Sequence, residues 1–191
     1  MDSGNVIGAT KRWVETVVIG LNLCPFAKRE VVNNRVRFTL TEAVTEEQLL
    51  IALEDELALL GKDSSIETTL LIHPAALQDF YDYNQFLDLA DRLLAEMKLI
   101  GVFQVASFHP GYQFGGTNPD DVENFTNRSP YPMLHIIREA SLERAIADYP
   151  DIDQVPARNV ELMNRLGLEH LQKLLKACFN DVDSAEDGIT V

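Results

Sequence analysis

IETTLLIHP at residues 66–74 and LIGVFQVASFHP at residues 99–110 are the clearest strand signals in the chain. Each is a short run of apolar and β-branched residues, as a buried strand requires, and each closes at a His-Pro pair. Between them, residues 77–97 carry apolar side chains at helical spacing, which predicts a long amphipathic helix. A strand, a helix and a second strand in this order predict parallel pairing through a right-handed crossover.

The flanking segments continue this alternation. Periodicity predicts two earlier helices, at 6–21 and 45–60, and an earlier strand at 35–41. It also predicts a late helical region at 155–179 that is broken near Gly167. MLHIIRE at 133–139 fits either a strand or a helix, and we expect a short strand followed by a helix over 141–149. The predicted fold is therefore α/β, or α+β, with about four strands in a mixed, largely parallel sheet, flanking helices and a helical C-terminus.

Net charge and composition restrict the expected partners. Among the 191 residues, 16 Lys and Arg face 30 Asp and Glu, and the resulting charge of −14 repels nucleic acids and anionic membranes. The opening segment has no basic and apolar leader pattern, and no apolar stretch is long enough to span a bilayer. We therefore expect a cytoplasmic protein with one domain over residues 1–180 and a disordered acidic tail over 181–191.

The segment from Phe108 to Glu139 is the predicted working surface. Its central run, GYQFGGTNPDDVENFTNRSPYP at 111–132, is rich in glycine and proline, which predicts a long loop with one helical turn at 120–125. Long loops in compact domains are commonly functional or disordered, and aromatic residues here argue against disorder. Donor groups concentrate in and beside this loop, which predicts a site for a small anion such as a phosphate or carboxylate.

Six residues are the predicted substrate-binding groups of that anion site: His73, Asn127, Arg128, Ser129, His135 and Arg138. His109 directly precedes the loop and is the predicted acid or base. A structural alternative stays open for three of them, and for Arg138 it is an ion pair with Glu139. His73 can simply cap its strand, and Arg128 can pair with an acidic side chain of its own loop such as Asp120.

Cys24 is a second candidate catalytic residue. It precedes Pro25 in GLNLCPFAKRE, and if Pro25 opens a short helix, Cys24 lies at the N-cap, where the helix dipole and nearby basic residues stabilise a thiolate. A buried, structural cysteine is the alternative. Cys178, on a late amphipathic segment, is predicted to be core filling, and both thiols are expected to be reduced.

The sequence contains no recognisable motif for a nucleotide cofactor or a metal ion. Gly115-Gly116 lacks the pattern of a P-loop or a dinucleotide-binding turn. The histidines have no HxxxH spacing and the cysteines no CxxC spacing, so we predict no metal site. The pattern names no cofactor.

Three motifs carry a resemblance to a known family: GLNLCPFA at 20–27, VASFHPGYQFGGT at 105–117 and ENFTNRSPYPMLHIIREAS at 123–141. With them the chain resembles a bacterial family described as domain of unknown function 1415, over residues 13–147. The resemblance implies a bacterial, cytoplasmic protein and implies no reaction, because none is assigned to the family.

Three hypotheses of function follow. The first is an enzyme or binding protein for a small anionic metabolite that uses the loop from 108 to 139. The second is a thiol-dependent enzyme or redox protein that uses Cys24. The third is a non-catalytic ligand-binding or scaffold protein whose polar motif fixes the loop. An exposed Cys24 beside the other site residues favours the second hypothesis, and buried, internally paired side chains favour the third.

Overall fold

A four-stranded sheet organises the structure, a computed structural model that describes residues 3–147, 149 and 151–180. Its strands lie in the order β1-β2-β4-β3. The bounds are Val36–Leu40 for β1, Thr68–Ile72 for β2, Met133–Arg138 for β4 and Phe103–Phe108 for β3. β1 and β2 pair in parallel through α3 (Glu46–Lys62), as the alternation of elements predicts. The α/β expectation and the four-stranded mixed sheet are confirmed.

The expectation of a largely parallel sheet is wrong, because β4 pairs antiparallel with both β2 and β3. β3 follows the crossover helix α4 (Phe80–Glu96) but does not pair with β2. After the long loop, β4 runs in the opposite direction and inserts between β2 and β3. Residues 133–139 are thus mostly strand, followed by α5 (Glu139–Ala147), in agreement with the preferred reading of that ambiguous segment.

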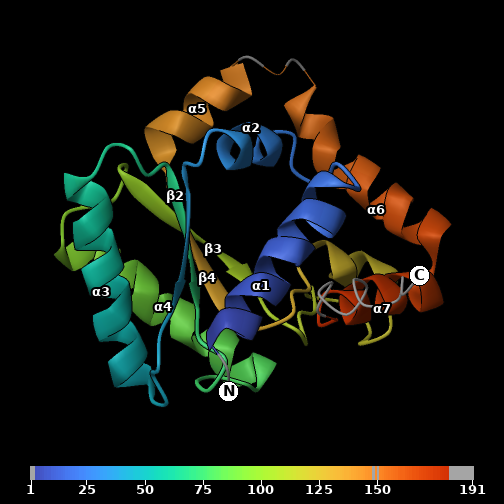
Figure 1. Cartoon of the computed structure of the whole chain (residues 1–191), viewed down its shortest axis with the longest axis horizontal. Coiled ribbons are helices and arrows are strands. Elements are labelled where there is room, and N and C mark those ends of the chain that lie inside the picture. Colours follow the sequence, from blue (N-terminus) through green and yellow to red (C-terminus); the bar gives the residue numbers. More distant parts are fainter. Residues whose placement is uncertain (1–2, 148, 150, 181–191) are drawn as a thin grey trace, which may run out of the picture.

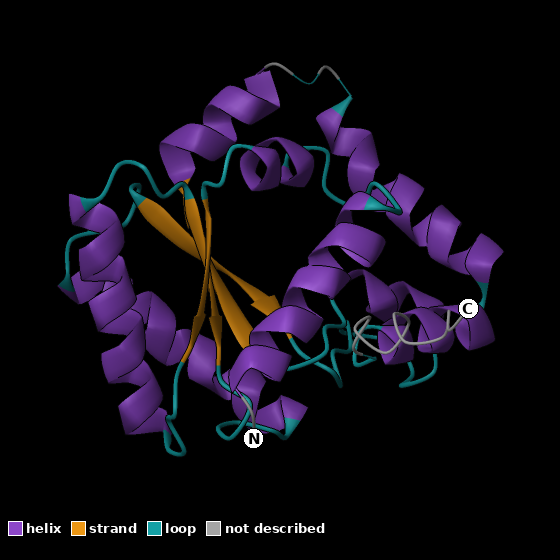
Figure 2. Ribbon diagram, viewed as in Figure 1, coloured by secondary structure: helices purple, strands orange, loops and turns teal. Residues whose placement is uncertain are grey.

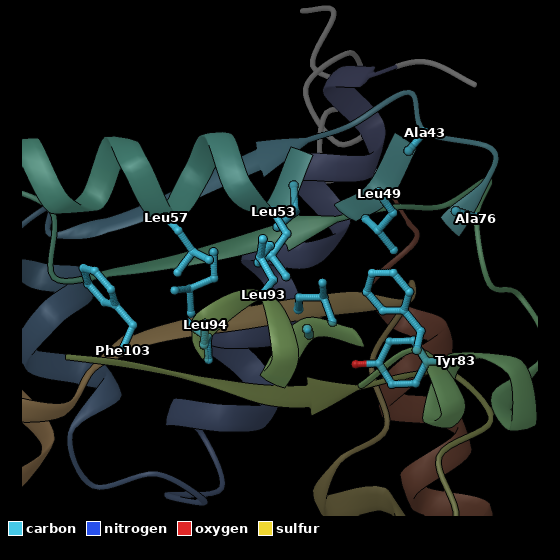
Figure 3. Packing of buried hydrophobic residues seen from close by; sticks show 14 of the residues in the cluster. Ala43, Leu49, Leu53, Leu57, Ala76, Tyr83, Leu93, Leu94 and Phe103 are labelled. Carbon is cyan, nitrogen blue, oxygen red and sulfur yellow. The ribbon is translucent and has the colours of Figure 1, made fainter. Parts of the chain in front are cut away.

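One face of the sheet is covered by α3 and α4 (Figures 1 and 2). Leucines of α3 interlock with the aromatic and aliphatic residues of α4 and with inward side chains of the strands (Figure 3). The largest of these residues are fully buried: Leu49, Leu53, Leu57, Leu60, Tyr83, Phe86, Phe103 and Leu134. The helix α3 begins where the sequence predicts, because the Thr45 hydroxyl accepts a hydrogen bond from Gln48 N as an N-cap.

The other face carries the N-terminal and C-terminal helices, which are α1 (Ser3–Trp13), η1 (Val14–Ile19), α2 (Ala27–Val32), α6 (Val155–Leu166) and α7 (Leu168–Ala177). Gly167 separates the last two, as predicted. Two 3₁₀ turns accompany them, at Val122–Thr126 and Ile152–Gln154. Alternation along the strands directs Leu70, Ile72 and Met133 to this face and Leu71, Leu134 and Ile136 to the other.

The first helix widens into a π-helix at η1. Leu23 N donates to Val18 O and Gly20 N donates to Glu15 O, so each of these bonds spans five residues instead of four. A Cβ on Gly20 would lie 2.2 Å from the carbonyl oxygen of Thr16, so this turn requires glycine. The widened turn ends the predicted helix early and leads the chain into the segment that carries Cys24.

The predicted disordered tail, 181–191, lies outside the described residues. Within 3–147, 149 and 151–180, no helix combines the length and apolar character needed to cross a bilayer.

Candidate functional site

A pocket of about 280 Å³ opens on the face of the sheet opposite α3 and α4. Its floor is formed by side chains of the strands, and its walls come from α1, η1, α2 and α5. Most of the lining is apolar and includes Trp13, Val14, Val18, Phe26, Leu70, Ala106, Phe108, Leu142 and Ala145. Seven polar or thiol-bearing residues interrupt it: Cys24, Arg29, Glu30, Glu67, Thr68, His135 and Ser141.

Cys24 reaches the pocket from the bend after η1 and is partly exposed. The expectation that it caps a helix is wrong, because α2 begins at Ala27 with Phe26 as its N-cap. Pro25 therefore does not open the helix. Cys178 is buried near the end of α7, where burial raises the pKa of its thiol, in line with its predicted role in the core. Of the two cysteines, Cys24 alone lines the pocket.

His135 reaches the same pocket from β4. Its Nε2 lies 2.6 Å from Thr68 Oγ1, and the Thr68 hydroxyl donates to the carbonyl oxygen of Ile136 at 2.6 Å. Because the Thr68 hydroxyl uses its one proton in the bond to Ile136, it accepts a hydrogen bond from His135 Nε2–H. Nδ1 is then the nitrogen that carries the lone pair in the neutral imidazole. Burial lowers the pKa of His135 to about 4, so the ring is neutral at pH 7.

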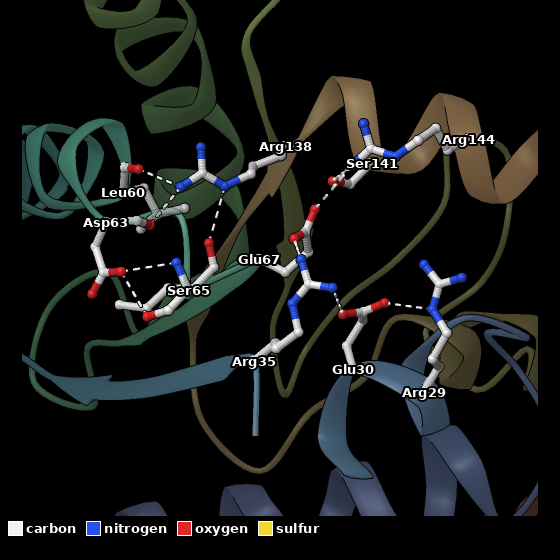
Figure 4. A network of polar contacts seen from close by, with 11 residues as sticks. Arg29, Glu30, Arg35, Leu60, Asp63, Ser65, Glu67, Arg138, Ser141 and Arg144 are labelled. Atoms are coloured by element: carbon white, nitrogen blue, oxygen red, sulfur yellow. Dashed lines mark hydrogen bonds and ion pairs between the residues drawn. The ribbon is translucent and has the colours of Figure 1, made fainter. Parts of the chain in front are cut away.

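Two buried glutamates stand at one side of the pocket in a network of arginines (Figure 4). Arg29 Nε donates to Glu30 Oε1 at 2.8 Å, and Arg35 Nη2 donates to Glu67 Oε2. The remaining carboxylate oxygens, Glu30 Oε2 and Glu67 Oε1, lie 3.5 and 3.8 Å from guanidinium nitrogens of Arg35 and Arg144 and accept no hydrogen bond. The side of the pocket that holds these two glutamates is therefore polar, although most of the lining is apolar.

The predicted anion-binding loop is held mainly by its own donors. Arg128 Nε donates to Tyr112 O, Arg128 Nη2 donates to Pro119 O, and its guanidinium lies 4.6 Å from the centre of the Phe125 ring. Asn127 Nδ2 donates to Ser107 O, and the Ser129 hydroxyl donates to Tyr131 O. These contacts match the structural alternative, although Arg128 binds backbone carbonyls and the alternative named a carboxylate.

Arg138 lies apart from the loop, at the far end of β4. Its Nε donates to Ile66 O at 3.0 Å, and its Nη2 donates to the carbonyl oxygens of Leu60 and Asp63 (Figure 4). Arg138 thereby satisfies carbonyls at the C-terminal end of α3, a position at which a cation is favourable. The structure does not bring Arg138 together with Arg128 or the two His-Pro histidines.

His73 and His109 directly follow β2 and β3, at the same end of the sheet, and face α4. Tyr83 lies between them, with ring centroids 5.8 Å from His73 and 5.0 Å from His109. His109 accepts from Gly111 N at Nδ1 and lies 3.1 Å from Leu77 O through Nε2. His73 lies 3.1 Å from Ala76 O through Nδ1, and its buried Nε2 has no hydrogen-bond partner. Burial lowers the pKa of both, that of His73 to about 4.

The predicted site residues thus divide between the two faces of the sheet. Cys24 and His135 both line the pocket, whereas His73 and His109 pack beneath α4. Sequence reasoning missed Glu30, Glu67 and Thr68, because isolated acidic and hydroxyl residues give no signal until the fold places them beside a cavity. Among the residues the structure describes, no cluster of three or more His, Cys, Asp or Glu side chains is arranged to hold a metal ion.

A second hollow, of about 540 Å³, adjoins the first and shares three lining residues with it: Val18, Cys24 and Phe108. Its other walls come from the loop and from the start of α6 and include Phe114, Glu123, Thr126, Asn127 and Asn159. Cys24 therefore stands where the two hollows meet.

Comparison with known proteins identifies a family and no close characterised relative. No curated protein and no solved structure shows significant similarity to the chain. The sequence model of the family described as "Protein of unknown function (DUF1415)" matches residues 5–173, which is most of the chain and includes Cys24, the loop and His135. The chain belongs to this DUF1415 family.

Proposed function

We propose that this protein binds a small molecule with an apolar body in the pocket between the sheet and the N-terminal helices, and that Cys24 is the reactive group of that site. The observation that carries the proposal is the presence of Cys24 and His135 in the lining of one apolar pocket. Binding sites of this kind are mostly apolar with a few placed polar groups. An engineered apolar cavity of about 150 Å³ binds benzene, so a pocket of 280 Å³ has room for a larger apolar body.

The neutral imidazole of His135 limits the chemistry available at rest. With a pKa of about 4, it is too weak a base to hold an ion pair with a thiolate at pH 7. Its Nδ1 lone pair is suited to accept a hydrogen bond, or to take a proton as a reaction proceeds. Binding is therefore the primary proposal, and catalysis by the thiol is the second, favoured by the shared pocket.

The anion hypothesis for the loop remains a competing proposal with weaker support. Its main cation, Arg128, and its amide, Asn127, already donate to backbone carbonyls. An anion would have to replace those contacts or use the remaining guanidinium nitrogen.

Alkylation by N-ethylmaleimide, read at each cysteine by mass spectrometry, tests the primary proposal. We expect Cys24 to react in the native protein, and Cys178 to react only after denaturation because it is buried. Saturating indole, a small apolar probe, should slow the reaction of Cys24 at least ten-fold. Ala106→Leu, which fills the pocket opposite His135, should remove this protection.

Ala52→Leu is the matched control, because Ala52 packs on the other face of the sheet and should leave protection by indole intact. Labelling of Cys24 that no apolar probe slows, in a protein that still melts cooperatively, would overturn the proposal.

A further inference from the structure

The two adjoining hollows differ in chemistry, and this difference defines a ligand more closely than either hollow does alone. The smaller is lined largely by apolar side chains of the sheet and helices. The larger combines apolar residues with polar groups of the loop and α6. Both reach Val18, Cys24 and Phe108, so one elongated molecule lying across these three residues would occupy both hollows.

The polar groups of the larger hollow are mainly hydrogen-bond acceptors. Asn159 is 9% exposed, its Nδ2 donates to Leu23 O at 2.8 Å, and its buried Oδ1 has no hydrogen-bond partner. Glu123 adds a carboxylate. An unpaired buried acceptor is unfavourable, so a ligand that donates a hydrogen bond to Asn159 Oδ1 recovers that cost on binding.

The remaining polar side chains of this hollow are occupied by the protein. Thr126 Oγ1 lies 2.9 Å from Glu123 O and 3.1 Å from Asn127 Oδ1, so its single proton is shared between these two acceptors. Asn127 Nδ2 donates to Ser107 O. Among the described residues that line the hollow, none is Lys or Arg. A carboxylate or phosphate head would therefore meet the Glu123 carboxylate without a compensating cation, in a protein of net charge −14.

We propose that the natural ligand is an amphipathic molecule whose apolar tail fills the smaller hollow and whose hydrogen-bond-donating head, a hydroxyl or an amine, lies in the larger hollow beside Asn159 and Glu123. The tail crosses Cys24 at the junction, which places the bond next to the head within reach of the thiol. This inference rests on the proposed function, which it sharpens by naming the class of ligand and by excluding an anionic head.

A series of probes with one tail and different heads tests the inference: 1-hexanol, hexylamine and hexanoate. Each is titrated at pH 7.5 into the intact protein, and the dissociation constant is obtained from its protection of Cys24 against N-ethylmaleimide. We expect hexanol and hexylamine to bind at least ten-fold more tightly than hexanoate. Ala106→Leu, which blocks the smaller hollow, should weaken all three.

Glu123→Gln separates charge from shape. Glu123 is partly exposed, so this variant should fold normally. The ratio of the dissociation constant of hexanoate to that of hexylamine should fall at least three-fold in this variant. Glu143→Gln, on an exposed position of α5 outside both hollows, removes the same charge and should leave the preference unchanged.

The outcomes distinguish the two proposals. If indole protects Cys24 but hexanoate binds as tightly as hexanol, the apolar pocket stands and the donor-head inference falls. If neither indole nor any hexyl compound protects Cys24, both fall. An unchanged head preference in Glu123→Gln would also overturn the placement of the head in the larger hollow.

Discussion

The two faces of the sheet differ in how tightly the helices pack against them, although the same strands form both faces. Beneath α3 and α4, leucines and aromatic rings fill the space, and even the histidines of the His-Pro pairs are enclosed. On the opposite face, the N-terminal and C-terminal helices leave two hollows between themselves and the strands. Close packing gives stability on one side, whereas incomplete packing on the other leaves space for a ligand.

The contrast also shows what the polar motifs do. Arg128, Asn127 and Ser129 hold the long loop in place, and Trp13 Nε1 donates to the Arg128 carbonyl oxygen at 3.1 Å. The motif that resembles a binding signature thus attaches the loop to the first helix. The loop that these residues hold in place supplies part of the wall of the larger hollow, including Asn127.

Truncation of core leucines should have the largest effect and should differ between the faces. Leu53→Ala, on the packed face, should lower the free energy of unfolding by about 2–5 kcal/mol, because it creates a cavity in a filled core. Leu142→Ala, beside the pocket, should cost about 1 kcal/mol or less, since its side chain is partly exposed and already borders open space. Urea denaturation measures both, and equal losses would contradict the proposed difference in packing.

Acid should destabilise the protein through one buried histidine on each face. Burial lowers the pKa of His73 and of His135 to about 4, from the ordinary histidine pKa of 6.5, so between these values the unfolded chain binds more protons. Stability is therefore fully present above pH 6.5 and falls as the pH drops toward 4, by up to about 3 kcal/mol for each histidine.

His73→Phe should reduce this loss between pH 6.5 and pH 4. The free energy of unfolding, measured by urea denaturation across that range, gives the slope for each variant. His170→Gln, at an exposed position on α7, is the control and should keep the wild-type slope. A slope that His73→Phe leaves unchanged would refute the assigned contribution of His73.

Arg128→Ala should lower stability less than the loss of a core leucine, and it decides between anchoring and anion binding. If the guanidinium anchors the loop, the variant loses about 1–3 kcal/mol of stability with or without inorganic phosphate. Arg165→Ala, which removes an exposed pair with Glu161, should cost at most about 0.5 kcal/mol. An unchanged melting temperature without phosphate, combined with loss of a phosphate-induced rise, would instead support the anion site.

Local signals in the sequence determined most of the elements. Apolar periodicity located α3 and α4, the Thr45 cap located the start of α3, and Gly167 located the break between the last helices. These features depend on neighbours within a few residues, so the chain encodes them directly. The sequence also singled out Cys24 and His135, though without any indication that they share a pocket.

Only the tertiary structure decided the direction of β4, the faces of the sheet and the pocket. Strand alternation shows that His135 and Ile136 point in opposite directions, but which face each meets depends on where β4 inserts between β2 and β3. The site likewise joins Cys24, Glu30, Glu67 and His135 from elements far apart in the chain. A cavity is the space that distant segments leave between them, and no local pattern of residues determines its lining.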